Sequence, residues 1–443
     1  MVSGGIALAL LVVAVALIIL CSSKLKINAF LVLIGVAYLY ALAIGMPPIE
    51  IMEVIRNGFG GLLTKVGLIY LCGTMMGTIL EKTGAAVSLT RFILKLVGKK
   101  NAPLAMGLSG FIVSIPVNCD PGFIILNSVN KGLSMDTGIS MAVMAVALAG
   151  GLYSTHTLVP PTAGPIGVAG VLEANLAYVI LYGAIVALVA TVVAWLWATR
   201  VCKKCDLKPK EAMSYEEVLA KFGRIPSAGH ALLPILWPLF IICMASFADM
   251  PSHPFGDGPI VDVIRTLGNP SLALFCSVLI AFTLVPKSSM REAWSTWIQD
   301  GMKDAAMIMF VTAAGGAFGA VLQASPMVDY ISEAMATMNL GLLLPFVIAA
   351  VLKTAQGSST VSMITTAGIV APLLGQLGVD PAICVLAIGS GAMCVSHTND
   401  SYFWVVSQFS GMDVDVALKN YSIMTGIIGI VSFGCTYLLS FIV

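Results

Sequence analysis

The chain has 443 residues and a formal net charge of +1, and 10% of its residues are charged while 58% are hydrophobic. A soluble domain usually carries about 25% charged residues, so this composition excludes an ordinary soluble globular protein. Many apolar runs exceed the roughly 18 residues that indicate a membrane span. We therefore expect an all-α polytopic membrane protein with the lipid bilayer and a small solute as partners, and with no nucleic-acid partner.

The first half of the chain predicts a series of membrane helices. The first 21 residues have no basic residue before their apolar run, unlike a signal peptide, so we expect a first span whose N-terminus lies outside. An apolar stretch further on is broken by prolines at 116–122. The expected spans are 4–21, 28–46, 60–81, a span from about 136 to 172 that unwinds at 153–166, and 175–198.

A polar linker follows at 199–229 and divides the chain into a first repeat, 1–198, and a second repeat, 230–443. The linker carries seven basic residues, and by the positive-inside rule it is cytoplasmic. These residues are Arg200, Lys203, Lys204, Lys208, Lys210, Lys221 and Arg224. The expected location is therefore the cytoplasmic (inner) membrane of a bacterium. No Gly-x4-Gly-Lys-Ser/Thr motif is present, so the energy for any transport must come from an ion or solute gradient or from a partner.

Landmarks of the first half recur in the second half in the same order and at a nearly constant offset. Such a recurrence predicts an internal duplication. Arg56-Asn57-Gly58 matches Gln299-Asp300-Gly301, Gly73 and Gly77 match Gly315 and Gly319, Leu133 and Asp136 match Leu377 and Asp380, and Ser154-Thr155-His156 matches Ser396-His397-Thr398. We interpret the Gly-x3-Gly pairs as sites of close helix packing. We expect Asp136 and Asp380 each to open and cap a span.

Charge distribution predicts that the second copy is inserted upside down. The basic cluster at 91–100 has no counterpart at 326–338, whereas basic residues occur at 287–303. Inverted repeats are typical of secondary transporters, whose substrate site lies near the midplane between the repeats. The count of spans then requires 103–132 and 340–375 to be re-entrant hairpins. We therefore expect two inverted-topology repeats, each with about five spans and one hairpin, unwound helices at the midplane, and both termini outside.

Polar residues at the predicted breaks form the candidate site. A break in a membrane helix must face a cavity or neighbouring protein, and a carboxylate at that depth is a candidate for function. The expected substrate-binding residues are Asn118 and Cys119 at the first hairpin tip, Lys353, Gln356, Gly357, Ser358, Ser359 and Thr360 at the second, and His156, Thr157, Thr162, His397, Thr398 and Asn399 in the unwound regions. The candidates for proton coupling are Asp120, Asp400, His156 and His397. We expect no metal site and no cofactor.

At these motifs the chain resembles the gluconate permease (GntP) family of bacterial proton symporters over nearly its whole length. The strongest carriers of the resemblance are Ala355–Thr365 and Gly389–Trp404. The resemblance implies a homodimer with scaffold and transport domains and an elevator-like motion. The chain departs from the family's usual residues at Asn118-Cys119, which are usually aromatic, at Thr162, which is usually histidine, and at Lys353, which is usually arginine.

These observations predict a proton-coupled symporter that takes up a small hydroxylated carboxylate, such as gluconate or a related sugar acid, by alternating access. Sodium coupling with a dicarboxylate and transport of a D-amino acid such as D-serine remain open as alternatives. Two alternatives come from other function classes. An intramembrane hydrolase is disfavoured because the chain lacks the His-Glu-x-x-His zinc motif. A channel would not accumulate its solute, so concentrative uptake would exclude it.

Overall fold

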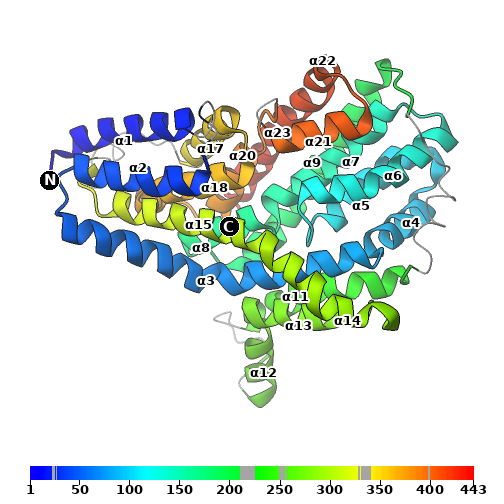
Figure 1. Cartoon of the computed structure of the whole chain (residues 1–443), viewed down its shortest axis with the longest axis horizontal. Helices are drawn as coiled ribbons and strands as arrows, with labels where there is room; N and C mark the ends of the chain where they lie inside the picture. Colours follow the sequence, from blue (N-terminus) through cyan, green and yellow to red (C-terminus); the bar gives the residue numbers. More distant parts are fainter. Residues whose placement is uncertain are drawn as a thin grey trace.

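The computed structural model describes residues 1–21, 25, 27–209, 225–248, 255–256, 258–327, 330, 341–397 and 400–443. Within these ranges the chain is helical, with no strand (Figure 1). The helices of the first half are α1 (Gly4–Ile19), α2 (Ala29–Ala43), α3 (Pro48–Lys82), α4 (Ala85–Val97), α5 (Ala102–Val113), α6 (Cys119–Thr137), α7 (Met141–Leu158), α8 (Ala163–Leu172) and α9 (Leu176–Arg200).

In the second half they are α11 (Ala228–Ala248), α12 (Pro259–Leu267), α13 (Pro270–Phe282), α14 (Met290–Glu292), α15 (Ile298–Gln323), α17 (Leu343–Gln356), α18 (Ser359–Val370), α19 (Leu374–Leu377), α20 (Pro381–Ala392), α21 (Ser401–Ser410), α22 (Val414–Ala417) and α23 (Ile423–Leu439). Short 3-10 or π turns join several of them. Most of the predicted linker, 210–224, and most of 326–338 lie outside the described residues.

Two groups of helices share most of their contacts internally. In the first, the long helices α3 and α15 pack along each other, and α2 and α13 pack against them. In the second, α7 packs between α5 and α9, α20 packs against α17 and α23, and α9 and α23 join these layers (Figure 1). The two groups meet where α15 packs against α18 and α3 packs against α8.

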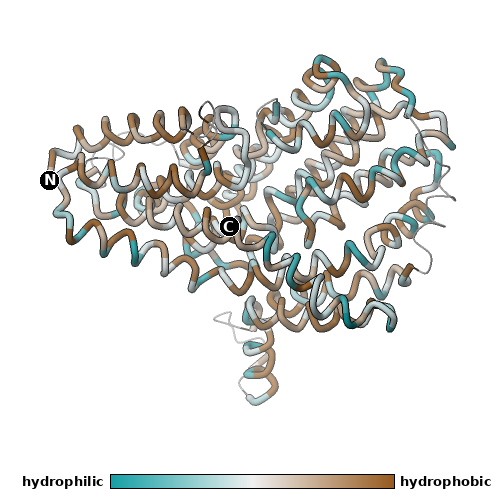
Figure 2. Tube along the Cα trace, in the orientation of Figure 1, coloured by the Kyte–Doolittle hydropathy of each residue, from teal (hydrophilic) through white to brown (hydrophobic). Residues whose placement is uncertain are grey.

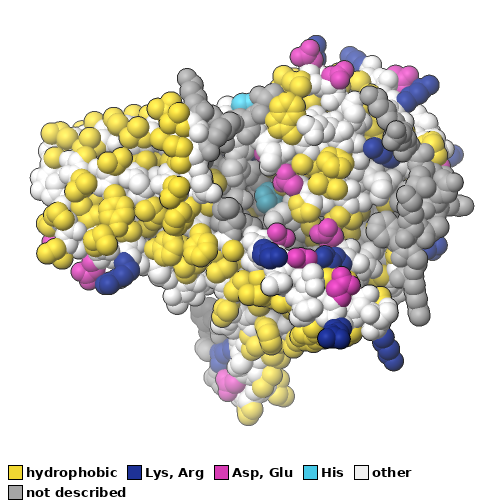
Figure 3. Space-filling model, in the orientation of Figure 1, with side chains coloured by type: hydrophobic (Ala, Val, Ile, Leu, Met, Phe, Trp, Pro, Cys, Tyr) yellow, Lys and Arg dark blue, Asp and Glu magenta, His cyan; other side chains and the backbone are white. Residues whose placement is uncertain are grey.

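Length and apolar composition identify a multi-pass membrane protein. Seven helices of the described residues are long and apolar enough to cross a membrane, or eight if the bent pair α12 and α13 forms one span. Figure 2 shows apolar residues along α1 and α2, and Figure 3 shows apolar side chains covering the face over these helices, as contact with lipid requires. The sequence predicted ten spans. The difference arises partly because α1, α2 and α20 are shorter apolar helices.

Several sequence-based boundaries need correction. The third helix begins at Pro48 rather than near residue 60, because proline is compatible with the first turn and no further proline occurs before the helix ends at Lys82. The second half also contains the short helix α12, which meets α13 at an angle of 76°. The second predicted re-entrant hairpin includes a helical segment, 359–377, that is long and apolar enough to span.

The two candidate capping aspartates behave differently. Asp380 is the N-cap of α20, where its carboxylate accepts hydrogen bonds from the backbone N–H groups of Ala382 and Ile383, so the prediction for this residue is confirmed. The prediction for Asp136 is wrong. Asp136 lies in the last turn of α6, and Ser140 caps the next helix, because Gly138 takes the left-handed conformation that ends α6 between them.

The predicted unwound region around His156 is shorter than the sequence suggested. Helix α7 remains regular through Leu158, so His156 and Thr157 are helical residues, and the break covers 159–162 before α8. The hydroxyl of Thr157 donates a hydrogen bond back to the Tyr153 carbonyl within the same helix. The prolines at 160, 161 and 165 all follow Val159, so they disrupt helical hydrogen bonding only beyond that residue. Helix α7 therefore continues to Leu158.

Candidate functional site

Three helices begin at one cavity in the middle of the protein. Asn118 is the N-cap of α6, Ser358 is the N-cap of α18, and Asp400 is the N-cap of α21. The Ser358 hydroxyl accepts from the Val361 N–H at 3.3 Å, and the Asp400 carboxylate accepts from the Tyr402 N–H at 3.1 Å. Because helix N-termini carry partial positive charge and free N–H groups, their convergence favours a bound anion.

This central cavity has a volume of about 290 Å³. The volume is at the lower end of the range for small-molecule sites, which is about 300–1,000 Å³. Its lining residues are Asn118, Cys119, Asp120, Pro121, Tyr153, His156, Val311, Ser358, Ser359, Thr360, Val361, Asp400, Ser401 and Tyr402. Eight of the predicted site residues are therefore brought together from α6, α7, α18 and α21.

Asp400, a lining residue of the central cavity, forms a buried ion pair with Lys353, which is not part of the lining. The Lys353 Nζ atom lies 2.6 Å from Asp400 Oδ2, and the two side chains are 0% and 6% exposed. Lys353 also donates to the Gly357 carbonyl, and Ser396 donates to the same Asp400 oxygen. Lys353 was predicted as a contact for a substrate carboxylate; in this structure its ammonium is held by a carboxylate of the protein itself.

Aromatic side chains surround this ion pair. The Tyr153 hydroxyl is 2.7 Å from the Ser359 hydroxyl, and Lys353 Nζ lies 5.7 Å from the centre of the Tyr153 ring. The Tyr402 ring lies against Tyr153 and Tyr421, and the Tyr421 hydroxyl donates to Ser396. These contacts tie α7, α18, α21 and the π turn Leu418–Ser422, which precedes α23, to one another around the cavity.

The two candidate histidines have different surroundings. His156 lines the central cavity, is 9% exposed, and its Nδ1 atom has no hydrogen-bond partner among the described residues. His397 lies outside the cavity lining, and its Nε2 is 2.8 Å from the Thr354 carbonyl. An unpartnered buried ring nitrogen is available to a solute, whereas the ring nitrogen of His397 is already engaged by α17.

Other predicted site residues are placed elsewhere or not described. Gly357 ends α17 with φ of 87°, a conformation that glycine adopts without strain, and its carbonyl accepts from Lys353. Thr157 is fully buried in α7 away from the cavity lining. Thr398 and Asn399 lie outside the described residues, as does the side chain of Gln356.

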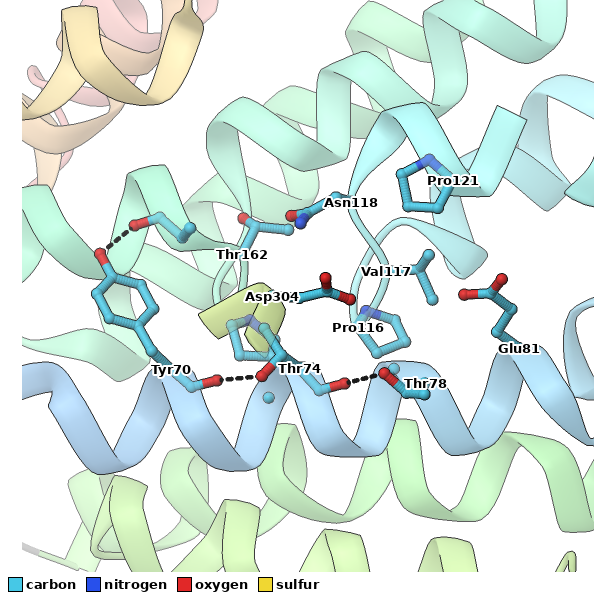
Figure 4. Close-up of a pocket in the computed structure, with 14 residues that line it drawn as sticks. Tyr70, Thr74, Thr78, Glu81, Pro116, Val117, Asn118, Pro121, Thr162 and Asp304 are labelled. Carbon is cyan, nitrogen blue, oxygen red and sulfur yellow. Dashed lines mark hydrogen bonds between the residues drawn. The ribbon is translucent and has the colours of Figure 1, made fainter. Parts of the chain in front are cut away.

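A second, smaller cavity lies on the other side of the first hairpin tip and has a volume of about 50 Å³. Asn118 and Pro121 line both cavities. Thr162 faces this second cavity, and Figure 4 shows Glu81 from α3 and Asp304 from α15 pointing toward the loop that contains Pro116. The loop at the first predicted hairpin tip therefore borders both the central cavity and a smaller cavity that carries two carboxylates.

Sequence reasoning missed several residues of these cavities. Tyr153 precedes Ser154, and Ser401 and Tyr402 follow Asp400. Their positions next to predicted motifs were the only sequence feature that could have indicated that they line the cavity. Val311, Glu81 and Asp304 come from α15 and α3, which carry no break. Nothing local in those helices marks a residue as lining a cavity.

Comparison with known proteins agrees with this architecture. The sequence profile of the GntP family permeases matches residues 6–442. The chain belongs to the GntP permease family. It is 32% identical to the high-affinity gluconate transporter of Escherichia coli K12, with 97% of this chain and 99% of the relative covered. The D-serine transporter DsdX of E. coli O6:H1 is 29% identical, with 98% of each chain covered. Membership makes this protein a membrane permease rather than an enzyme.

A solved structure also resembles this fold. The YdaH transporter of Alcanivorax borkumensis matches with a TM-score of 0.58 at 14% identity, with 88% of each chain covered. At this identity the match shows a shared transporter fold and says nothing of the substrate.

Proposed function

We propose that this protein is a proton-coupled symporter that takes up a small hydroxylated carboxylate, such as gluconate or a related sugar acid, through the central cavity. The observation that carries the proposal is the convergence of three helix N-termini on one cavity, where the lining residue Asp400 holds the buried Lys353 ammonium. These groups attract a carboxylate. The hydroxyl groups of Ser358, Ser359, Thr360 and Ser401 at the same cavity suit a polyhydroxylated solute.

Charge balance supports coupling to a cation. Lys353 brings one positive charge to this site, and Asp120 and Asp400 bring two negative charges when both are ionised. A substrate carboxylate would add a third negative charge to a buried space, where an unpaired charge is costly. Binding therefore favours the simultaneous uptake of at least one proton, or of one sodium ion in the alternative mechanism.

The arrangement of Lys353 and Asp400 suggests how a proton enters. A substrate carboxylate that binds the ammonium of Lys353 competes with Asp400 Oδ2 for the same donor. Once Asp400 loses this partner, a proton on its carboxyl group restores neutrality. Asp120 and His156 line the same cavity and can pass or hold a second proton. His397 stays a weaker candidate because its ring nitrogen is engaged by Thr354.

For the motion we propose an elevator in which one helix group carries the site along the other. The scaffold group would contain α1–α3, α11–α13 and α15, and the transport group would contain α5–α9 and α17–α23. The order of hairpin, broken helix and final helix recurs in 102–200 and 343–439, which supports two repeats at 1–198 and 230–443 around the linker 199–229. We retain the inverted insertion, the re-entrant hairpins, the homodimer, the bacterial inner membrane, the cytoplasmic linker and the outward termini as parts of this proposal.

Transport assays with the purified full chain in proteoliposomes test the function. An inward proton gradient should drive accumulation of labelled gluconate without sodium, and dissipating the gradient with a protonophore should abolish it. Accumulation that requires sodium would replace the proton with sodium, and equilibration without accumulation would refute symport.

D-Serine is the second candidate substrate. The relative DsdX is named a D-serine transporter, and the central cavity of this protein is lined by two carboxylates. The ammonium of a D-amino acid can pair with Asp120 while its carboxylate occupies the positive site. A competition assay decides between them: unlabelled D-serine that displaces labelled gluconate only weakly favours the sugar acid, and the reverse order favours the amino acid.

A further inference from the structure

We propose that a third cavity, lined by α5, α7 and α9 at the edge of the membrane, binds the phosphate headgroup of an anionic phospholipid. This headgroup cavity has a volume of about 470 Å³ and is separate from both cavities at the first hairpin tip. Its lining residues are Lys100, Asn101, Pro103, Gly138, Ile139, Ser140, Val143, Trp195, Thr199, Lys203 and Asp206.

The charged groups of the headgroup cavity favour an anion. Lys100 and Lys203 are exposed, and neither has an ion-pair partner within the described part of the chain. Asp206 is the carboxylate in the lining, so the side chains leave one net positive charge. Two long helices, α5 and α7, also begin at this cavity with Asn101 and Ser140 as their N-caps, which adds the partial positive charge of their N-termini.

The wall of the cavity is held in place by the segment that follows α9. The Ser140 hydroxyl donates to the Cys205 carbonyl at 2.5 Å and accepts from the Leu207 N–H at 3.2 Å. The Leu207 carbonyl accepts from the Met141 N–H at 2.7 Å. These bonds fasten the segment to the start of α7, so Lys203 lines the cavity as part of a folded wall.

The surface of α9 explains why the phosphate belongs to a lipid. Leu181, Ile185 and Leu188 are 51%, 49% and 43% exposed, and they lie three or four residues apart, so they share one face of the helix. Trp195 and Thr199 continue this face into the headgroup cavity. From Leu188 to Trp195 the helix rises about 10 Å, and from Leu181 about 21 Å, which spans one leaflet of about 15 Å.

Trp195 marks the level of the headgroups on this face. Tryptophan is enriched at the boundary between lipid and water, and basic pockets between membrane helices on the cytoplasmic side bind anionic headgroups. Its indole N–H has no partner among the described residues and can donate to a phosphate oxygen or glycerol ester. Acyl chains would then lie along Leu181, Ile185 and Leu188, while the phosphate sits between the two lysines.

Native mass spectrometry of the detergent-purified full chain tests this site. We expect phosphatidylglycerol or cardiolipin to remain bound to the wild type and the double variant K100Q/K203Q to lose more than about tenfold in affinity. The matched control is K95Q/K208Q, which removes two exposed lysines that are not in the lining and should bind as the wild type does. Equal losses of lipid affinity in the two double variants would show that binding depends only on general surface charge, and would overturn the proposal.

Two further arms identify the source of the phosphate. Phosphatidylcholine should bind at least tenfold more weakly than phosphatidylglycerol, and equal binding would contradict an anion site. Glycerol 3-phosphate or inorganic phosphate should not compete with the lipid at millimolar concentration; effective competition would make this a site for a soluble phosphate. Brominated phosphatidylglycerol should also quench the tryptophan fluorescence of the wild type more than that of W195F, because Trp195 lines the cavity. Equal quenching in the two proteins would place the lipid elsewhere.

Discussion

The ammonium of Lys353 and the carboxylate of Asp400 form an ion pair of 2.6 Å in the interior of the protein, although 47 residues separate them in the chain. The pair joins the last turn of α17 to the start of α21 beside the central cavity. In the proposed mechanism, a substrate carboxylate that enters this cavity displaces Asp400 from the same lysine. The pair therefore connects the integrity of the fold to the proposed exchange of substrate and proton.

Removing one partner of this pair should destabilise the protein strongly. Lys353→Met leaves the buried Asp400 carboxylate without its cation, and such a loss costs about 3–5 kcal/mol. The apparent melting temperature in detergent should fall clearly, whereas Lys353→Arg should stay close to the wild type because it preserves the charge. The double variant K353M/D400L should recover part of the stability without transport. If K353M melts as the wild type does, the pair has no structural role.

Tyr153 offers a milder test of the central cavity. Tyr153→Phe deletes the hydroxyl that lies 2.7 Å from Ser359 and keeps the ring over Lys353. Loss of one neutral hydrogen bond is worth about 0.5–1.5 kcal/mol, so the KM for uptake should rise about two- to tenfold with expression unchanged. Tyr182→Phe is a control outside the cavity lining, and its KM should not change. An unchanged KM in Y153F would separate this hydroxyl from substrate binding.

The interface between the two helix groups can be tested with a cross-link. Lys65 of α3 and Glu173 at the end of α8 form an exposed ion pair of 2.6 Å across that interface. In a background without the ten native cysteines, a short bridge between cysteines at 65 and 173 should arrest uptake reversibly. The control bridge between 82 and 300 replaces the pair Lys82 and Asp300, which joins α3 to α15 within one group. That bridge should leave uptake intact, and full activity of both would contradict an elevator.

Two glycines of α3 provide a matched pair of substitutions. A Cβ atom at Gly77 would overlap the Pro116 carbonyl oxygen at the first hairpin tip, whereas one at Gly73 would have an ordinary contact of 3.7 Å with the Pro161 carbonyl oxygen. Gly77→Ala should therefore displace the tip and lower the maximal uptake rate severalfold, and Gly73→Ala should not. Equal rates in the two variants would show that the tip tolerates displacement.

The sequence allowed prediction of the elements that carry their own local signals. Proline and polar residues in apolar runs marked the breaks at Asn118 and Ser358, and Asp380 before a proline marked a helix cap. These signals act over a few residues, so they can be recognised without the tertiary structure. The family assignment followed from the same motifs and is confirmed by the match over residues 6–442.

The remaining features depend on packing between distant helices. The ion pair of Lys353 could not be predicted, because nothing near it in the chain identifies Asp400 as its partner. Asp136 was misplaced because its resemblance to Asp380 outweighed the turn signal of Gly138. Glu81 and Asp304 are ordinary polar residues at the ends of long helices, and only the fold shows that both face the first hairpin tip.

The most direct test of the account compares two transport modes of Asp400→Asn in proteoliposomes. The asparagine cannot exchange a proton, yet its amide keeps a hydrogen-bonding group beside Lys353. We predict that D400N loses accumulation of gluconate driven by a proton gradient but retains counterflow exchange of labelled for unlabelled substrate. Accumulation by D400N at the wild-type level would contradict the central claim that displacement of Asp400 from Lys353 couples the proton to the substrate.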